Sequence, residues 1–137
     1  MDQRIIYQND EGGVAVIIPS DCGLTIEEIA AKDVPTGSPY KIVAVADVPT
    51  DRTFRDAWVA DKNTITVDVA KAKGLAHKMR RDRRAAEFAP LDIEATIPDR
   101  AVAAEEKRQL VRANDDKLQT EIDAAKDVDD LKRLLDT

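Results

Sequence analysis

The sequence feature that most constrains the fold is a change to helical periodicity at residue 68. Residues 66–89, TVDVAKAKGLAHKMRRDRRAAEFA, predict a single long helix. Asp68 suits its N-cap, because the carboxylate can accept hydrogen bonds from the free N–H groups of the first turn. Pro90 is expected to end the helix, because a proline disfavours the α conformation of the residue before it. The chain therefore divides into two unlike parts.

The long helix has the pattern of an interaction helix. An apolar stripe at three- and four-residue spacing is formed by Val69, Ala72, Ala76, Met79 and Ala86, with Arg83 falling inside it. The opposite side is expected to carry Lys71, Lys73, Lys78, Arg80, Arg81 and Arg84. A narrow stripe of small residues suits packing against a partner helix better than deep burial. The candidate partner-binding residues are Met79, Arg80, Arg81, Arg83 and Arg84.

The chain before the long helix has the pattern of a small sheet. Residues 4–8 and 13–19 are rich in β-formers and flank the turn sequence at 9–12, so they predict a β-hairpin. Residues 40–46 predict a third strand, and residues 63–67 favour a short strand before the long helix.

Two short helices are expected to cover this sheet. Thr25 and Glu28 form a capping box at the start of the first. The second is expected to begin near residues 49–51. It would place Phe54 and Trp58, four residues apart, on one helix face as structural anchors against the sheet.

The chain after the long helix predicts a return helix. Residues 90–98 form a connector, and residues 99–125 predict a second helix that is either continuous or broken at residues 114–116. Asp127 is expected to cap a last turn over residues 128–135. Because the alanine-rich stripe buries little area, the long helix is not expected to form a stable coiled coil by itself. It is expected to pair with the second helix, whose Glu105, Glu106 and Asp116 can face the Arg80–Arg84 cluster.

These patterns predict an α+β fold: a small, mainly antiparallel N-terminal sheet with short covering helices, followed by a C-terminal helical hairpin. The expected domains are residues 1–64, and residues 65–137 as a hairpin with a short terminal helix.

The charge distribution argues against non-specific nucleic-acid binding. The net charge is -6, and the basic run at residues 78–84 has no interleaved aromatic residues for base stacking. The segments before and after residues 63–90 are acidic, whereas that segment is basic. Either these charges pair within one molecule, or the basic helix contacts another subunit.

No apolar run is long enough to span a membrane, and the first ten residues lack a signal-peptide core, so we expect a soluble protein made inside a cell.

The sequence contains no pattern that predicts catalysis. Cys22 is the only cysteine, which rules out an internal disulfide and a thiolate zinc site. His77 is the only histidine, and we expect it to be an exposed structural residue without a nearby carboxylate. Ser20 and Ser38 lack a nucleophile-elbow setting, and no phosphate-binding glycine motif is present. We therefore expect no enzyme, no cofactor and no metal site.

Two stretches resemble small tail proteins of tailed bacteriophages and prophages. The segments RIIYQNDEGGVAVIIP and VPTDRTFRDAW are similar to the start of proteins encoded beside tail-fibre genes. The later segments AKGLAHKMRRDRRAAEFAPLD, EEKRQLVRA and IDAAKDVDDLKRLL resemble the carboxyl half of tail-fibre-associated proteins and tail assembly chaperones. The matching positions are Ala72, His77, Arg81, Arg84, Leu91, Asp92, Lys107, Leu110, Arg112, Leu131 and Lys132. The segment at residues 134–137 lacks the aromatic residues that often end such proteins.

The resemblance implies a structural or assembly role. Such a protein would bind other phage tail or tail-fibre proteins through its helices, and contact neither nucleic acid nor membrane. The resemblance also leaves open a homo-oligomer. The protein would act in the host cytoplasm during assembly and remain in the virion tail. The alternative is a phage-encoded regulatory protein that binds a host cytoplasmic protein.

Overall fold

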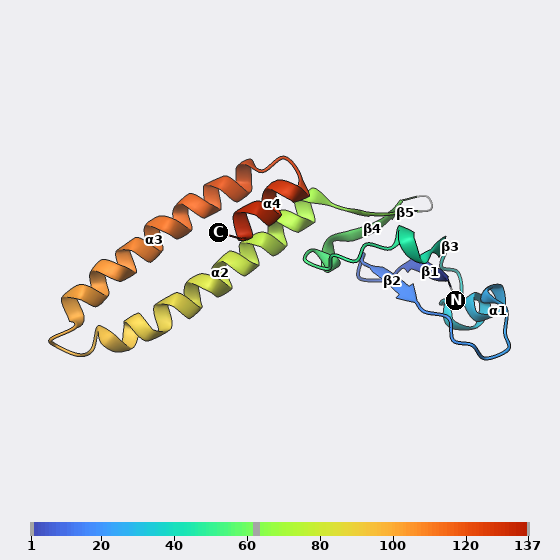
Figure 1. The fold of residues 1–137 in the computed structure, drawn as a ribbon, viewed down its shortest axis with the longest axis horizontal. Coiled ribbons are helices and arrows are strands. Elements are labelled where there is room, and N and C mark those ends of the chain that lie inside the picture. The colour runs from blue at the N-terminus through green and yellow to red at the C-terminus, as the bar shows by residue number, and fades with distance from the viewer. Residues whose placement is uncertain (1, 62–63, 137) are drawn as a thin grey trace. The chain divides into compact units, whose positions relative to one another are not determined.

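A computed structural model describes residues 2–61 and 64–136. With 55% helix and 17% strand, and a small antiparallel sheet preceding the helices, it confirms the predicted α+β class. The chain forms two compact units, Met1–Lys71 and Ala72–Thr137, which we call the N-terminal unit and the helical unit and describe separately (Figure 1).

The N-terminal unit is built on a three-stranded antiparallel sheet in the order β2-β1-β3. The central strand β1 (Gln3–Gln8) pairs with β2 (Val14–Ile17) and with β3 (Tyr40–Ala44). The predicted hairpin is confirmed. Its turn contains Gly12 at φ +83, a conformation that glycine adopts without strain, and the Asn9 side chain accepts hydrogen bonds from the backbone N–H groups of Glu11 and Gly13. The third strand is shorter than expected, because Val45–Asp47 form a 3-10 turn, η1.

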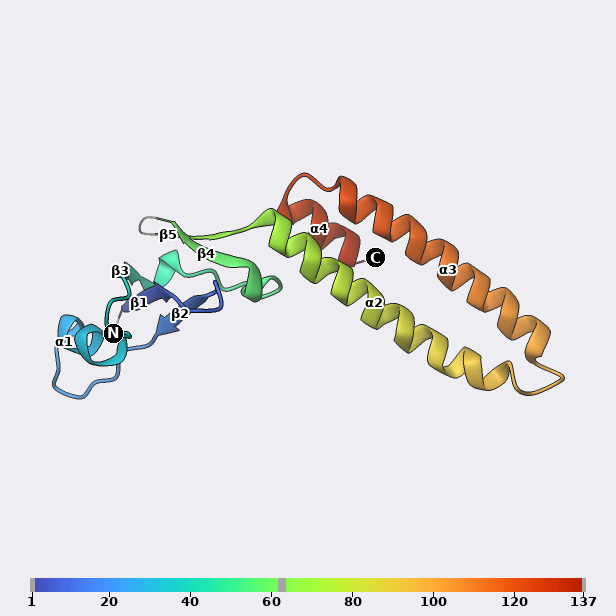
Figure 2. The same cartoon turned by 180° about the vertical axis from the view of Figure 1, so that it is seen from behind.

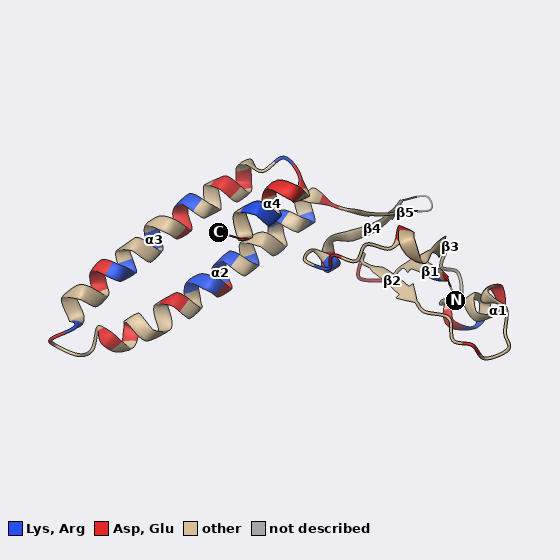
Figure 3. Cartoon of the chain, viewed as in Figure 1, with Lys and Arg blue, Asp and Glu red and all other residues tan. Residues whose placement is uncertain are grey.

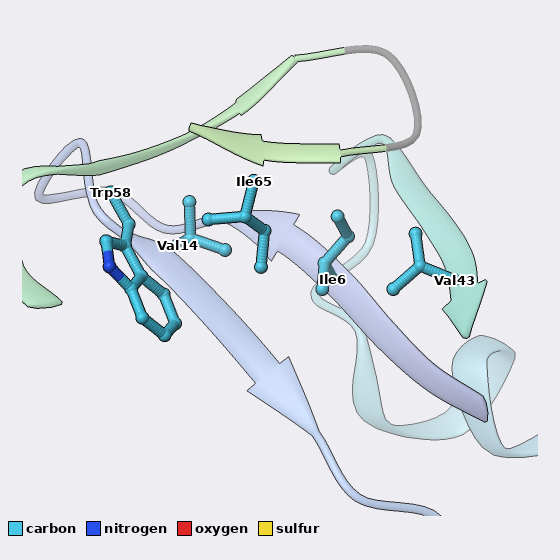
Figure 4. Close-up of a cluster of buried hydrophobic side chains, with 5 residues drawn as sticks. All are labelled: Ile6, Val14, Val43, Trp58 and Ile65. Carbon is cyan, nitrogen blue, oxygen red and sulfur yellow. The ribbon is translucent and has the colours of Figure 1, made fainter. Parts of the chain in front are cut away.

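Neighbouring isoleucines of β1 point to opposite faces of the sheet and create two separate cores. Ile5 packs beneath α1 (Ile26–Asp33), together with Ile29, Ala30 and Val34. Ile6 lies on the other face in a cluster with Val14, Val43, Trp58 and Ile65 (Figure 4).

Helix α1 begins at the predicted capping box. The backbone N–H of Glu28 donates to Thr25 Oγ1 at 3.2 Å, and the backbone N–H of Thr25 donates to Glu28 Oε2 at 3.2 Å. Two free N–H groups of the helix start are therefore satisfied by local side chains.

The prediction of a second covering helix is wrong, because this segment forms a 3-10 turn followed by a β-hairpin. Phe54 precedes a 3-10 turn, η2 (Arg55–Ala57), and Trp58 is the first residue of β4 (Trp58–Asp61). This strand pairs antiparallel with β5 (Thr64–Val67). The pairing of the two strands therefore outweighs the helical signal in the four-residue spacing of the two aromatic residues. Phe54 and Trp58 are both buried, with exposed fractions of 2% each, although they do not share a helix face.

The pairing of β4 with β5 also explains the division of the chain. The expected boundary followed residue 64 and assigned most of β5 to the helical part. Because β5 pairs with β4 in a separate two-stranded sheet and its Ile65 packs in the core cluster of the N-terminal unit, the boundary of the compact units lies later, between Lys71 and Ala72. The expected strand position at Asn63 lies outside the described residues.

The helical unit contains two long helices side by side and a short third helix. They are α2 (Val69–Glu94), which begins in the N-terminal unit, α3 (Ala101–Ala124) and α4 (Val128–Leu135), which lies at one end of the pair (Figures 1 and 2). Asp68 caps α2 through the backbone N–H of Lys71 at 3.1 Å, and Asp127 caps α4 through that of Asp130 at 2.8 Å, as predicted. Helix α3 is continuous through residues 114–116.

Pro90 does not end α2, contrary to the prediction. The helix continues to Glu94 with the proline inside it. Pro90 is exposed, so the carbonyl that loses its backbone donor can be hydrated. Helix α3 contacts α2 on both sides of the proline: the Arg112 guanidinium lies 5.6 Å from the centroid of the Phe88 ring before it, and Asp92 pairs with Arg108 at 3.1 Å after it.

Candidate partner-binding surface

The inner face of α2 is narrow and partly polar. Its buried residues are Ala72, Ala76 and Arg80, which follow one another at four-residue spacing along one side of the helix. Arg80 is only 6% exposed, so its predicted position on the solvent side is wrong. Met79, which was expected in the apolar stripe, is 38% exposed instead. The packed face includes Arg80 and leaves Met79 exposed, so it is rotated around the helix axis relative to the predicted stripe.

Arg80 is buried because α3 supplies a buried carboxylate. Its Nη1 donates to both carboxylate oxygens of Asp115, at 2.8 and 2.7 Å. The Asp115 side chain is 5% exposed and also accepts from Nη1 of Arg84 at 2.9 Å. Removing one partner of such a pair leaves an uncompensated buried charge, which commonly costs about 3–5 kcal/mol. Arg80 and Asp115 therefore hold the two long helices together.

His77 extends this polar contact toward the start of α2. Its Nδ1 accepts from Nε of Arg80 at 3.3 Å, so Nε2 carries the proton and donates to Oδ1 of Asp123 at 2.7 Å. The expectation that His77 is exposed and without a carboxylate partner is wrong, since its side chain is 17% exposed. Nζ of Lys73 donates to the backbone carbonyl of Asp123 at 3.0 Å. Three polar side chains of α2 are thus fixed by residues of α3 or by one another.

The five candidate partner-binding residues do not form one patch. Arg80 is interior, and Arg83 is half-buried with its Nη2 donating to the backbone carbonyl of Leu135 at 2.6 Å. Arg84 is tied to Asp115 but keeps 39% of its side chain exposed. Met79 and Arg81 are exposed, and two helical steps turn the chain by about 200° from one to the other, so they face nearly opposite directions. Arg81 makes no ion pair within the described part of the chain.

The acidic residues expected to face the arginines are not their partners. Glu105 pairs with Arg108 at 3.0 Å and with Arg112 at 3.1 Å, both on its own helix. The hydrogen bond from Arg112 lowers the pKa of the Glu105 carboxyl, and the nearby charges act in the same direction. Glu106 and Asp116 are exposed. Asp115 was missed, although it lies two helical turns before Ile122 on the same buried face of α3.

Charged and large apolar side chains share the surface of the helical unit. Both helices carry basic and acidic residues, and on α2 the basic residues lie toward its start while only acidic ones follow Arg84 (Figure 3). Between them, Ile93, Val102 and Leu110 are 67%, 75% and 64% exposed. Large apolar side chains with this much exposure provide apolar surface that a partner protein can bury.

A hollow with a volume of about 300 Å³ lies between α2 and α3. Arg83 and Arg84 line it from α2, and Val111, Lys117 and Leu118 line it from α3. We call these five residues the basic groove. Asp115 forms part of the same wall, so the ion pair that joins the helices also positions Arg84 at the groove.

Other chemistry in the described residues is sparse. They contain no group of three or more His, Cys, Asp or Glu side chains placed to hold a metal ion. Cys22 is exposed. The pKa of its thiol is lowered, mainly by a hydrogen bond with the backbone of Leu24 and to a smaller extent by one with the Ser20 side chain. Across the same residues, no helix has the length and apolar character needed to cross a membrane.

Comparison with known proteins adds no assignment: no family model, curated protein or solved structure matches this chain.

Proposed function

We propose that this chain is a non-enzymatic protein of a phage tail that binds a tail-tip or tail-fibre component through its helical unit. The observation that carries the proposal is the surface of α2 and α3. An internal ion pair fixes the two helices, while Arg81, Met79 and several large apolar side chains remain exposed on them. A stable helical scaffold with exposed arginine and apolar residues has the composition of a protein-binding surface.

The resemblance to tail-fibre-associated and tail assembly proteins supports the choice of partner. It covers segments of both units and includes Arg81 and Arg84 of α2. In this role the protein works in the host cytoplasm during assembly and stays in the virion if it is a structural component.

The test is mass spectrometry of purified particles from the phage or prophage that encodes the chain. Stoichiometric amounts in particles support a structural component. Absence from particles, with capture of a tail or tail-fibre protein from infected cells, supports a transient assembly factor. Capture of a host protein and of no tail protein would contradict the proposal and favour the regulatory alternative.

A variant experiment locates the contact on α2. Arg81→Glu is expected to weaken binding of the captured component about fivefold, because an exposed charge at an interface is worth up to about 1 kcal/mol. Lys107→Glu makes the same charge change at an exposed position of α3 and serves as the control. Arg80 is unsuitable for this test, because reversing a buried partner of Asp115 would damage the fold. Equal weakening by both variants would indicate a general charge effect and no specific contact.

A further inference from the structure

The basic groove has a mixed wall. Arg83, Arg84 and Lys117 supply positive charge, while Val111 and Leu118 are half-buried and supply an apolar strip along α3. The complete wall of the hollow contains four basic and three acidic side chains, which leaves one positive charge in excess.

The excess charge is available to a ligand. Asp115 is shared by two guanidinium groups, so its one negative charge does not neutralise both Arg80 and Arg84. Lys117 is 77% exposed, and its nearest carboxylate, Glu121, is 3.9 Å away, at the outer limit of an ion pair. Arg84 contacts Asp115 through Nη1, so its other N–H groups can bind a second carboxylate, and Lys117 can bind one without breaking a close ion pair.

Helix α4 shows what kind of segment packs beside this groove. It is an amphipathic helix with acidic residues in its first turn, and it buries Leu131 completely. Its last carbonyl, that of Leu135, accepts the hydrogen bond from Arg83, and Arg83 lines the groove. The groove thus begins where α4 ends, and its described lining residues come from α2 and α3 alone.

We propose that the basic groove binds an acidic amphipathic helix of a partner protein. One or two carboxylates of that helix would meet Arg84 and Lys117, and an apolar side chain three or four residues away would meet Val111 and Leu118. The inference rests on the proposed partner-binding function and names the chemical class of the partner. Nucleic acid fits less well, because no aromatic residue among those described lines the hollow to stack on a base.

The probe is a pair of synthetic helical peptides of roughly four turns, with the same leucine stripe and either glutamate or lysine on its flanks. Fluorescence anisotropy with the full chain should show that the glutamate peptide binds at least about tenfold more tightly than the lysine peptide, since the two place opposite charge against the same groove. Amide shifts in the NMR spectrum should concentrate at Arg84, Val111 and Leu118.

Two matched variants locate the contact. Lys117→Glu is expected to weaken the glutamate peptide about fivefold, whereas Lys107→Glu, on the same helix but outside the groove, should change its affinity less than about twofold. Both lysines are exposed, so neither change should disturb folding, and retained amide shifts elsewhere verify this.

Several results would overturn the proposal. They are equal affinity for the two peptides, no binding of either, equal effects of the two variants, or a single-stranded DNA oligonucleotide that shifts the groove amides more than the glutamate peptide does. If the glutamate peptide binds as described but no tail component is captured, the groove assignment holds and the tail role fails. If a tail component is captured and Lys117→Glu binds it as well as wild type, the tail role holds and the groove assignment fails.

Discussion

The two units of this chain build their interiors from different materials. Of the seven largest fully buried side chains, five belong to the N-terminal unit: Trp58, Phe54, Ile5, Ile6 and Val14. The long helices of the helical unit bury alanines, Ile122 and the Arg80–Asp115 pair. A twisted sheet offers two faces to large apolar residues, whereas two alanine-rich helices bury little area and gain their definition from directional charge contacts. Apolar volume therefore fixes the first unit, and charge geometry fixes the second.

The largest effect is expected from Asp115→Ala, which removes the carboxylate shared by the two long helices. It leaves Arg80 buried without its carboxylate and is expected to destabilise the helical unit by about 3–5 kcal/mol. Amide hydrogen exchange should accelerate in α2 and α3 while β1 keeps its protection. The control is the double variant Arg80→Met with Asp115→Leu, which removes both charges and should recover most of the loss. Unchanged protection in Asp115→Ala would show that the ion pair does not hold the helices together.

The opposite test removes apolar volume from the N-terminal unit. Ile6→Ala is expected to cost about 3 kcal/mol, because Ile6 is 1% exposed and its truncation leaves a cavity beside Trp58. Exchange should accelerate in β1–β3 and leave α3 unaffected. Ile18→Ala is the matched control, since Ile18 is 70% exposed and its loss should have almost no effect. Similar losses in the two variants would contradict a core centred on this cluster.

Features set by neighbouring residues could be predicted from the sequence, whereas contacts between distant segments could not. The turn at residues 9–12, the capping box at Thr25 and the caps at Asp68 and Asp127 are local, and all form as predicted. Trp58 was misassigned because its strand partner lies across a hairpin whose pairing outweighs the local spacing of the aromatic residues.

The candidate site was harder to predict, for a related reason. The spacing of the apolar residues predicts the phase of α2, and this phase places Arg80 among the basic residues of the solvent side. Arg80 faces inward because a specific carboxylate on α3 lies opposite it, and nothing within residues 66–89 reveals that carboxylate. A pairwise contact between distant segments is not encoded in the periodicity of either segment.

A smaller effect is expected where α2 contains its proline. Pro90→Ala restores a backbone donor inside the helix and should stabilise the helical unit by about 1–3 kcal/mol, because proline in a helix interior is about 3 kcal/mol less favourable than alanine. Urea unfolding followed by exchange in α2 measures the gain. Ala89→Gly at the exposed neighbouring position should instead lower stability by up to about 1 kcal/mol. A loss of stability in Pro90→Ala would indicate that the helix needs the proline to follow α3.

The smallest expected effect concerns surface charge on α3. The pKa of Glu105 is lowered, chiefly by the hydrogen bond from Arg112, so ionised Glu105 favours the folded state. This contribution is present above the unfolded pKa of about 4.3 and is lost as the pH falls through the lower folded value. Wild type should therefore lose slightly more stability on acidification than Glu105→Gln, measured as the shift in the urea midpoint. Glu106→Gln, at the adjacent exposed position, should behave as wild type.

The shared carboxylate of Asp115 also has a consequence for how this sequence can diverge. A mutation at Arg80 or Asp115 alone strands a charge in the interior, so an evolving lineage would have to pass through a poorly folded intermediate to replace the pair. Related chains should therefore vary at these two positions together or at neither, whereas Arg84, which is partly hydrated, should drift more freely. Correlated substitution at positions 80 and 115 would then be an inherited record of the contact between the two long helices.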